Sequence, residues 1–347
     1  LYSLLHLTGY DLSLDDLREF RQWGSKTPGH PEFGVTPGVE TTTGPLGQGL
    51  ANAVGMAMAE RHLAARFNGD GHALVNHRTF VICGDGDLME GISYESASLA
   101  GHLGLGRLIC LYDDNQITIE GSTRITFTED VAARFEACKW QVLRVEDGND
   151  ISAVEAALSQ ACEDLERPSL VMLRTHIAYG SPNKQDTADA HGAPLGEEEV
   201  CRTKECLGCP PESTFCVSDE VRDECRRCIE RGKKWEAEWQ QTFDEWTASH
   251  PDKVDDWVNA VSGFLPSGWD GDIPRFGPDD GPLATRAASG KVLNAIAGRL
   301  PTLMGGSADL APSNKTFIDG CAEFQKGSYA GRNIRFGVRE HAMAAVM

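Results

Sequence analysis

The sequence lacks long apolar runs and is poor in positive charge. No segment approaches the ~18 consecutive apolar residues of a membrane-spanning helix, so we expect no membrane partner. Only 32 Lys and Arg residues face 52 Asp and Glu residues, for a formal net charge of -20. This charge argues against nucleic acid or an anionic membrane surface as the main partner, because both repel an acidic protein. It leaves room for a small local site that binds phosphate groups.

A starting methionine and a secretory signal peptide are also absent. The first residues, LYSLLHLTGYD, have the pattern of a helix end, and the last, FGVREHAMAAVM, stop soon after a helix has begun. We therefore expect the chain to be incomplete at both ends. A C-terminal address signal, for example one for peroxisomes, would then lie outside this sequence.

The eleven cysteines are an odd number, and Cys83 and Cys110 lie inside apolar strand-like runs. This usage is typical of free thiols in a reducing compartment, so we expect a cytoplasmic protein. One cluster has a second interpretation, because Cys206-x2-Cys209 and Cys225-x2-Cys228 match the spacing of a four-cysteine zinc site. The segment around the second pair has an exposed-helix pattern and no knuckle glycine, which favours unmetallated thiols.

Apolar strand-like segments alternate with helical segments along the first half of the chain. Continuous apolar strands that alternate with helices predict an α/β fold, in which helices cover both faces of a parallel sheet. Ligands of such sheets bind beyond the carboxyl ends of the strands. The expected strands are 78–87, 106–115, 141–147 and 168–176, and the expected helices are 50–67, 91–105, 130–140 and 151–165.

Composition predicts two domains of unequal length. Residues 1–261 form the first α/β domain, with a charged helical excursion at about 197–260. A linker rich in Gly, Pro and Asp follows at 262–282. Residues 283–347 are the start of a second α/β domain, with a helix at 283–300, a strand at 301–311 and a closing strand at 334–338. Near the N-terminus, Ser13 and Asp16 predict a capped helix over 14–23, before a long Gly- and Pro-rich loop.

Two polar side chains follow neighbouring predicted strands. Asp85 ends one strand in VICGDGD, and Asn115 ends the next strand thirty positions later. Parallel strands would deliver both to one edge of the sheet, where Gly84 and Gly86 allow a ligand close to the backbone. Their oxygens, with a carbonyl such as that of Ile117, suit Mg²⁺ and a diphosphate. The alternative for each residue alone is an ordinary surface turn.

A second glycine-rich loop, TTTGPLGQGLANAVGM, opens an apolar helix. Free N–H groups at a helix start suit an anion or a polar heteroaromatic edge, although a tight turn before a packed helix has the same pattern. His30, His191 and Arg286 are, one by one, as compatible with turn or first-turn helix residues as with a site.

Taken together, these motifs resemble one known family. TPGHPE, TTGPLGQG, GDG followed by YDDNQITIEG, HGAPLG, GGSADLAPSN and FGVREHAM stand in the order found in transketolases. The resemblance covers essentially the whole chain and is weakest around 200–280. Other thiamine-diphosphate enzymes share the GDG…N element but not the full set. The fold implied is the thiamine-diphosphate-binding fold, with a diphosphate-binding domain followed by a pyrimidine-binding domain.

The resemblance implies a role for individual residues. Asp85, Asn115 and the Ile117 carbonyl would bind Mg²⁺, for which Ca²⁺ or another divalent ion can substitute in the family. The implied cofactor contacts are Gly44, Pro45, Leu46, Gly86, Asn115 and His191. The implied substrate contacts are His30, His191, Arg286 and Ser313, where Arg286 and Ser313 resemble a phosphate clamp. The implied catalytic residues are Glu340, His30 and His191, where a buried acid at Glu340 donates to the aminopyrimidine ring.

The implied activity is reversible transfer of a two-carbon ketol unit through a thiamine diphosphate carbanion. The donor would be a ketose phosphate such as xylulose 5-phosphate, and the acceptor an aldose phosphate such as ribose 5-phosphate. The family forms homodimers whose active sites are shared, so Glu340 would serve the neighbouring subunit. Glu90 and Glu95 are either close to that interface or ordinary solvated helix residues.

Two alternative functions remain open. One is a relative that passes the two-carbon unit to formaldehyde, a dihydroxyacetone synthase, whose motifs would be nearly the same here. The other is a non-catalytic fragment that binds cofactor or dimerises. Because we expect residues to be missing on both sides, we also expect the 347-residue chain alone to be inactive or nearly so.

Overall fold

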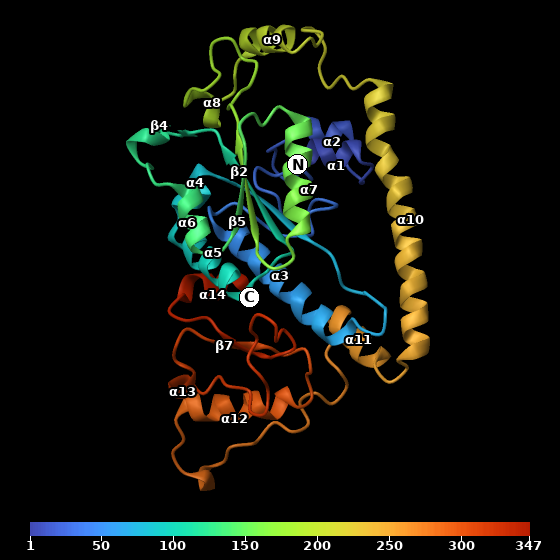
Figure 1. The fold of residues 1–347 in the computed structure, drawn as a ribbon, viewed down its shortest axis with the longest axis vertical. Coiled ribbons are helices and arrows are strands. Elements are labelled where there is room, and N and C mark those ends of the chain that lie inside the picture. The colour runs from blue at the N-terminus through green and yellow to red at the C-terminus, as the bar shows by residue number, and fades with distance from the viewer.

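The computed structural model describes residues 1–347. At its centre lies a four-stranded parallel sheet in the order β1-β2-β6-β5. Figure 1 shows this sheet between helices, which confirms the predicted α/β architecture. The strands are β1 (Thr79–Gly84), β2 (Leu108–Asp114), β5 (Gln141–Val145) and β6 (Ser169–Arg174).

Short helices and a small hairpin complete this part of the chain. The hairpin of β3 (Ile117–Thr118) and β4 (Gly121–Ser122) follows β2 directly and leads into the 3₁₀ helix η1 (Thr123–Ile125). The helices are α1 (Tyr2–Leu7), α2 (Leu14–Arg18), α3 (Gln48–Phe67), α4 (Asp85–Met89), α5 (Gly91–Leu103), α6 (Val131–Ala137) and α7 (Ile151–Glu163).

The two faces of the sheet pack against different helices. Cys110 and Tyr112 of β2 join the main hydrophobic core, which α3, α5 and α6 complete. The alternate residues Ile109 and Leu111 belong to a second core, formed with α7. This alternation follows from the two-residue period of a strand. The central strand β2 thus buries both of its sides.

The β1 edge of the α7 face is open. Phe80 and Ile82 of β1 are 54% and 75% exposed, although the register pairs them with Ile109 and Leu111. The cause is the position of α7, which packs on β5 and β6 at the opposite edge of the sheet.

A helical arm follows β6. It contains α8 (Asp189–Gly192), α9 (Glu197–Cys206), α10 (Asp219–Ser249) and α11 (Val254–Val261). The 31-residue α10 runs along one side of the molecule, as Figure 1 shows. Its C-terminal part is fixed by Trp246, which packs with Trp257 of α11 around Phe67 at the end of α3.

The last part of the chain packs against the first. It consists of a 3₁₀ helix, η2 (Pro278–Asp280), then α12 (Thr285–Ala297), β7 (Gly305–Ser307), α13 (Ala311–Asn314), β8 (Asn333–Arg335) and α14 (Glu340–Val346). Strands β7 and β8 pair in parallel, and α14 lies on α3 and α5. A Cβ on Gly55 of α3 would lie 2.1 Å from the Val346 carbonyl oxygen, so this glycine allows the close approach.

The predicted helix over 14–23 is shorter in the structure. It begins at the predicted Ser13–Asp16 capping box but ends at Arg18. Arg21 has a left-handed backbone (φ 63°), and its N–H donates to the Thr27 carbonyl at 2.9 Å. A left-handed residue cannot continue a right-handed helix, so the chain turns there.

The predicted strands at 301–311 and 334–338 are also shorter. Each retains only three residues, in β7 and β8. Asp309 and Gly337 have φ values of 63° and 64°, which bend the chain out of the extended conformation that a strand requires.

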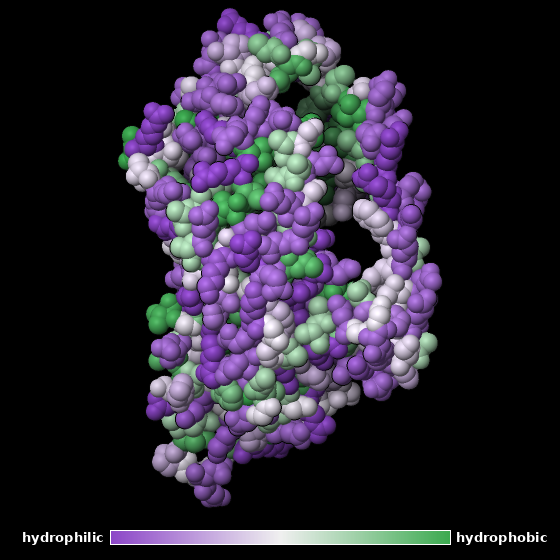
Figure 2. All heavy atoms as spheres, in the orientation of Figure 1, coloured by the Kyte–Doolittle hydropathy of each residue, from purple (hydrophilic) through white to green (hydrophobic).

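Hydrophilic residues dominate the face drawn in Figure 2, and apolar residues form scattered patches on it. This agrees with the net charge of -20. None of the helices combines the length and the hydropathy that a membrane span needs.

We predict that Leu99→Ala lowers the free energy of unfolding by about 2–5 kcal/mol. Leu99 of α5 is 0% exposed in the main core, so its truncation leaves a cavity. Urea unfolding followed by circular dichroism measures the loss. Leu265→Ala is the matched control, because Leu265 is 59% exposed, and equal losses in both variants would contradict this description of the core.

Candidate cofactor and metal site

The carboxyl ends of β1 and β2 meet at one edge of the sheet. The register pairs Gly84 with Asp113, so Asp85 and Asn115, which follow them, leave the sheet at the same edge. The structure therefore brings together the two side chains that the sequence predicts as neighbours.

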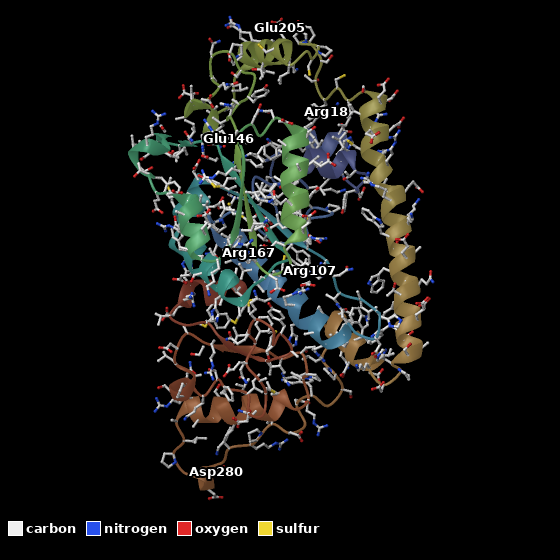
Figure 3. The ribbon with its side chains drawn as sticks, in the orientation of Figure 1. Arg18, Arg107, Glu146, Arg167, Glu205 and Asp280 are labelled. Atoms are coloured by element: carbon white, nitrogen blue, oxygen red, sulfur yellow. The ribbon has the colours of Figure 1, made fainter.

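Figure 3 identifies the amino and carboxyl ends of the parallel strands. Arg107 and Arg167 precede β2 and β6 and lie where the strands begin, whereas Glu146 follows β5 and lies where the strands finish. The residues around Asp85 lie at the same carboxyl ends of the strands as Glu146, which is where parallel sheets bind their ligands.

Asp85 is a buried carboxylate, only 4% exposed. The Tyr112 hydroxyl donates to its Oδ1 at 2.5 Å, and the Gln116 N–H donates to its Oδ2 at 3.1 Å. Burial raises the pKa of Asp85 most, and the nearby Asp114 raises it further, while the two hydrogen bonds lower it. Burial and the bond to Asp85 also raise the pKa of Tyr112, so its hydroxyl stays protonated as a donor.

The surroundings of Asp85 fit a divalent cation. The charged neighbours with the largest effect on its pKa are two carboxylates, Asp114 and Asp113, and both raise it. A buried carboxylate among carboxylates is stabilised when a cation binds beside it. Asn115 and the Ile117 carbonyl contribute neutral oxygens, which Mg²⁺ accepts as ligands.

Asn115 is held in place by its neighbours. Its Nδ2 donates to Asp113 Oδ2 at 3.2 Å, and its Oδ1 accepts the Ile117 N–H at 2.9 Å. Asp113 in turn accepts a hydrogen bond from the Thr175 hydroxyl, just after β6. Gln116 has a left-handed backbone (φ 63°). This tight turn keeps the side-chain oxygen of Asn115 beside the backbone of Ile117.

The glycine-rich loop before α3 also joins the site. A Cβ on Gly44 would lie 3.1 Å from Cγ of His30, and a Cβ on Gly86 would lie 3.2 Å from Leu46 Cδ1. The structure thus brings His30 against Gly44, and Leu46 against the GDG loop. Pro45 and Leu46 are exposed, on the side where a ligand has access.

Glu340 is the first residue of α14 and is exposed in the single chain. The acid expected here serves the neighbouring subunit, so its burial stays a prediction about the assembled dimer; within this chain no other segment covers the carboxylate. The Ala342 N–H donates to Glu95 Oε2 at 2.8 Å. Through this bond Glu95 caps the first turn of α14. From the sequence, Glu90 and Glu95 are either interface residues or solvated helix residues, and the bond was not predicted.

Arg339 and His341, which flank Glu340, fasten α14 to the first part of the chain. Arg339 Nη2 donates to Ser98 Oγ of α5 at 2.9 Å, and His341 Nε2 lies 3.1 Å from Gln48 Nε2 of α3. The Glu340 side chain makes no hydrogen bond within the chain. Arg339 and His341 therefore fix the start of α14, while the Glu340 carboxylate remains free to contact a ligand or another subunit.

Two predicted substrate residues lie apart from Asp85. Arg286 is in the first turn of α12 and Ser313 is in α13, and both are exposed. The two helices pack where Gly290 meets Lys315. Figure 1 shows α12 and α13 well separated from α4, the helix that Asp85 begins.

His191 is exposed in the single-turn helix α8. Figure 1 shows α8 in the same half of the molecule as α4. No hydrogen bond joins the His191 side chain to the residues around Asp85, so its role stays a prediction.

Sequence reasoning missed two residues of the site, Tyr112 and Asp87. The two carboxylate oxygens of Asp87 accept the N–H groups of Gly47 and Gly84, each at 2.9 Å. An acidic residue three positions after a helix start is a capping pattern, so the bond to Gly84 had a signal in the sequence. The bond to Gly47, forty residues away, had none.

The cysteine cluster gives no support to the zinc pattern. Cys206 and Cys209 are exposed, and Cys225 and Cys228 lie along α10. The structure contains no group of three or more His, Cys, Asp or Glu side chains placed to hold a metal ion. The metal site predicted at Asp85 would be of another kind, because an amide and a backbone carbonyl would supply its other oxygens.

We predict that Asp85→Asn stabilises the metal-free protein by about 0.5–2 kcal/mol. The variant removes a buried charge, while its amide oxygen still accepts from Gln116 and its nitrogen donates to Tyr112. Thermal unfolding in EDTA measures the gain. Asp270→Asn, at an exposed position, is the control with no expected change. A less stable Asp85→Asn protein would show that the charge is already compensated.

Comparison with known proteins gives the same assignment along the whole chain. The family model "Transketolase, thiamine diphosphate binding domain" matches residues 1–266, and "Transketolase, pyrimidine binding domain" matches residues 281–347. The transketolase of Geobacillus stearothermophilus is 56% identical over 348 aligned residues, which are 100% of this chain and 52% of that protein.

Solved structures agree with the fold. Two structures of Pichia stipitis transketolase, a mutant with xylulose 5-phosphate and a complex with sedoheptulose 7-phosphate, each match with a TM-score of 0.97 and 44% identity. Each comparison covers 100% of this chain and 52% of the other. The chain thus spans about half the length of the relatives that it matches. The matched domains support thiamine diphosphate as the cofactor, and the chain belongs to the transketolase family.

Proposed function

We propose that this chain serves the transketolase reaction, the reversible transfer of a two-carbon ketol unit from a ketose phosphate to an aldose phosphate. The observation that carries the proposal is the buried Asp85 carboxylate at the carboxyl edge of the sheet, in a domain of a thiamine-diphosphate-binding family. Bound thiamine diphosphate supplies the nucleophilic carbon and the electron sink for carbon–carbon bond cleavage. The protein's residues bind, orient and exchange protons around it.

The proposed metal is Mg²⁺, bound by Asp85, Asn115 Oδ1 and the Ile117 carbonyl. These residues would hold the ion, which would offset the negative charge of the diphosphate, while Gly86 would leave room for the phosphates beside the backbone. The burial of Asp85 beside the carboxylates Asp114 and Asp113 supports this proposal, because a metal ion would supply compensating positive charge.

The remaining residues handle the cofactor ring and the sugar phosphate. Gly44, Pro45 and Leu46 contact the cofactor, and Glu340 hydrogen-bonds its pyrimidine ring. His30 and His191 exchange protons with the substrate hydroxyls. In the same proposal Arg286 and Ser313 bind the substrate phosphate, for which the guanidinium offers two parallel donors. Xylulose 5-phosphate as donor is supported by its complex with the Pichia stipitis relative.

We propose a homodimer in which each active site takes residues from two subunits. Helices α12 and α13, which carry Arg286 and Ser313, lie far from α4, which Asp85 begins (Figure 1), and Glu340 is exposed. One chain therefore does not gather all the proposed residues around one ligand, whereas a second copy can supply those that are missing. A cytoplasmic location belongs to the same proposal and is supported by eleven unpaired cysteines.

We predict that the purified protein binds thiamine diphosphate only when Mg²⁺ is present, and that Asp85→Ala abolishes this binding. The reason is that the diphosphate and the carboxylate repel each other without the ion. Titration followed by tryptophan fluorescence measures the affinity, with Asp270→Ala as the control. Unchanged binding by Asp85→Ala would refute the metal site.

The acceptor distinguishes the alternative functions. With xylulose 5-phosphate as donor, turnover with ribose 5-phosphate supports transketolase, and turnover only with formaldehyde supports the dihydroxyacetone synthase alternative. Cofactor binding without turnover of either acceptor supports a binding or dimerising module.

We predict that Asp85→Ala and Glu340→Gln subunits complement each other when mixed. If sites are shared, a mixed dimer contains one site with both wild-type residues, so random mixing restores roughly a quarter of the high-affinity cofactor sites. Isothermal titration with thiamine diphosphate and Mg²⁺ counts them. Sites built within single subunits would restore none, because every site would then carry one of the two substitutions.

A further inference from the structure

Asp87 connects two loops that are distant in the sequence. Its Oδ1 accepts the N–H of Gly47, in the glycine-rich loop before α3, at 2.9 Å. Its Oδ2 accepts the N–H of Gly84, at the start of the GDG loop, also at 2.9 Å. One carboxylate therefore bridges the loop proposed to contact the cofactor ring and the loop proposed to hold the metal and diphosphate.

The carboxylate and its distant partner are both held firmly. The Ser93 hydroxyl donates to the backbone carbonyl of Asp87 at 2.5 Å, which ties this residue to α5. Gly47 is buried and has a left-handed backbone (φ 76°). A Cβ on Gly47 would lie 2.7 Å from Ile92 and 2.8 Å from the Ser93 hydroxyl. The N–H of Gly47 thus has a fixed direction, and Asp87 is its acceptor.

We propose that Asp87 is a positioning residue that sets the spacing of the Gly44–Gly47 and Gly84–Gly86 loops, so that the cofactor cleft is formed before the cofactor binds. Hydrogen bonds to an ionised carboxylate are stronger than neutral ones. Two of them, converging from two loops, keep Leu46 against Gly86, where the loops touch. A cleft that is already ordered does not lose this conformational freedom on binding. The identity of the ligand, thiamine diphosphate with Mg²⁺, rests on the proposed function.

Three variants separate this role from helix capping. Asp87→Ala removes both bonds. Asp87→Asn keeps the shape but has one acceptor oxygen, and its amide nitrogen would meet the second N–H, so one loop is released. Asp16→Ala is the matched control, because Asp16 caps α2 in the same way, accepting the Ser13 N–H at 2.7 Å, but contacts neither loop.

The first measurement is hydrogen exchange of the cofactor-free protein. We expect both the Gly47 and the Gly84 amides to exchange about 5- to 30-fold faster in Asp87→Ala, and one of the two to do so in Asp87→Asn, as the loss of one such hydrogen bond implies. Asp16→Ala leaves both amides unchanged. Protection of both amides that is equal in the wild type and both Asp87 variants would overturn the proposal. If Asp87→Ala does not fold, the isosteric Asp87→Asn decides: faster exchange of either the Gly47 or the Gly84 amide supports the proposal, and wild-type protection of both overturns it.

The second measurement is affinity for thiamine diphosphate with Mg²⁺, together with kcat at saturating cofactor where turnover is detected. We expect both Asp87 variants to bind roughly 5- to 30-fold more weakly, with kcat retained once the cleft is filled. Wild-type affinity in both variants would overturn the effect on binding. Absence of cofactor binding by the wild-type protein would instead refute the proposed function, and the exchange of the Gly47 and Gly84 amides would still decide whether Asp87 joins the loops.

Discussion

The arrangement of this protein depends on a carboxylate buried at the end of a strand. Asp85 is almost fully removed from water and has other carboxylates as its charged neighbours. Such a group opposes folding unless donors and a cation compensate its charge. Tyr112 and the Gln116 N–H supply two donors, and the oxygens of Asn115 lie close by. A buried charge that destabilises the fold locally is typical of functional sites, where the packing of the surrounding residues offsets its cost in stability.

The sheet makes that position possible. Because β1 and β2 are parallel and in register from Thr79 and Leu108 onward, their ends coincide and their polar termini meet. The two cores on either face hold the strands rigidly enough to keep Asp85 buried. From there, the site extends along two loops and reaches α14, whose helix start is held by α3 and α5. The second part of the chain is therefore joined to the first through the packing of α14 on α3 and α5 rather than through Asp85 and Asn115.

The sequence predicted the fold class and most of the elements, because strand and helix periods are local properties of the chain. It predicted that the strands before Asp85 and Asn115 end side by side, and the register of β1 and β2 agrees, because it pairs Gly84 with Asp113. The ends of α2, β7 and β8 were not predicted. Arg21 after α2 and Asp309 after β7 adopt left-handed backbones, and neither residue type by itself requires that conformation. The exposure of Glu340 was likewise not predictable, because burial depends on what the rest of the chain covers.

The sequence by itself determined the alternation of strands and helices and the chemistry available at the strand ends, because both follow from neighbouring residues. Only the tertiary structure decided which polar groups meet across the fold. Asp87 binds Gly47 across forty residues, and Glu95 caps α14 across 247. Such bonds have no sequence signal, since any acidic residue with a suitable direction and burial can form them. The backbone packing of the folded chain selects the one that does.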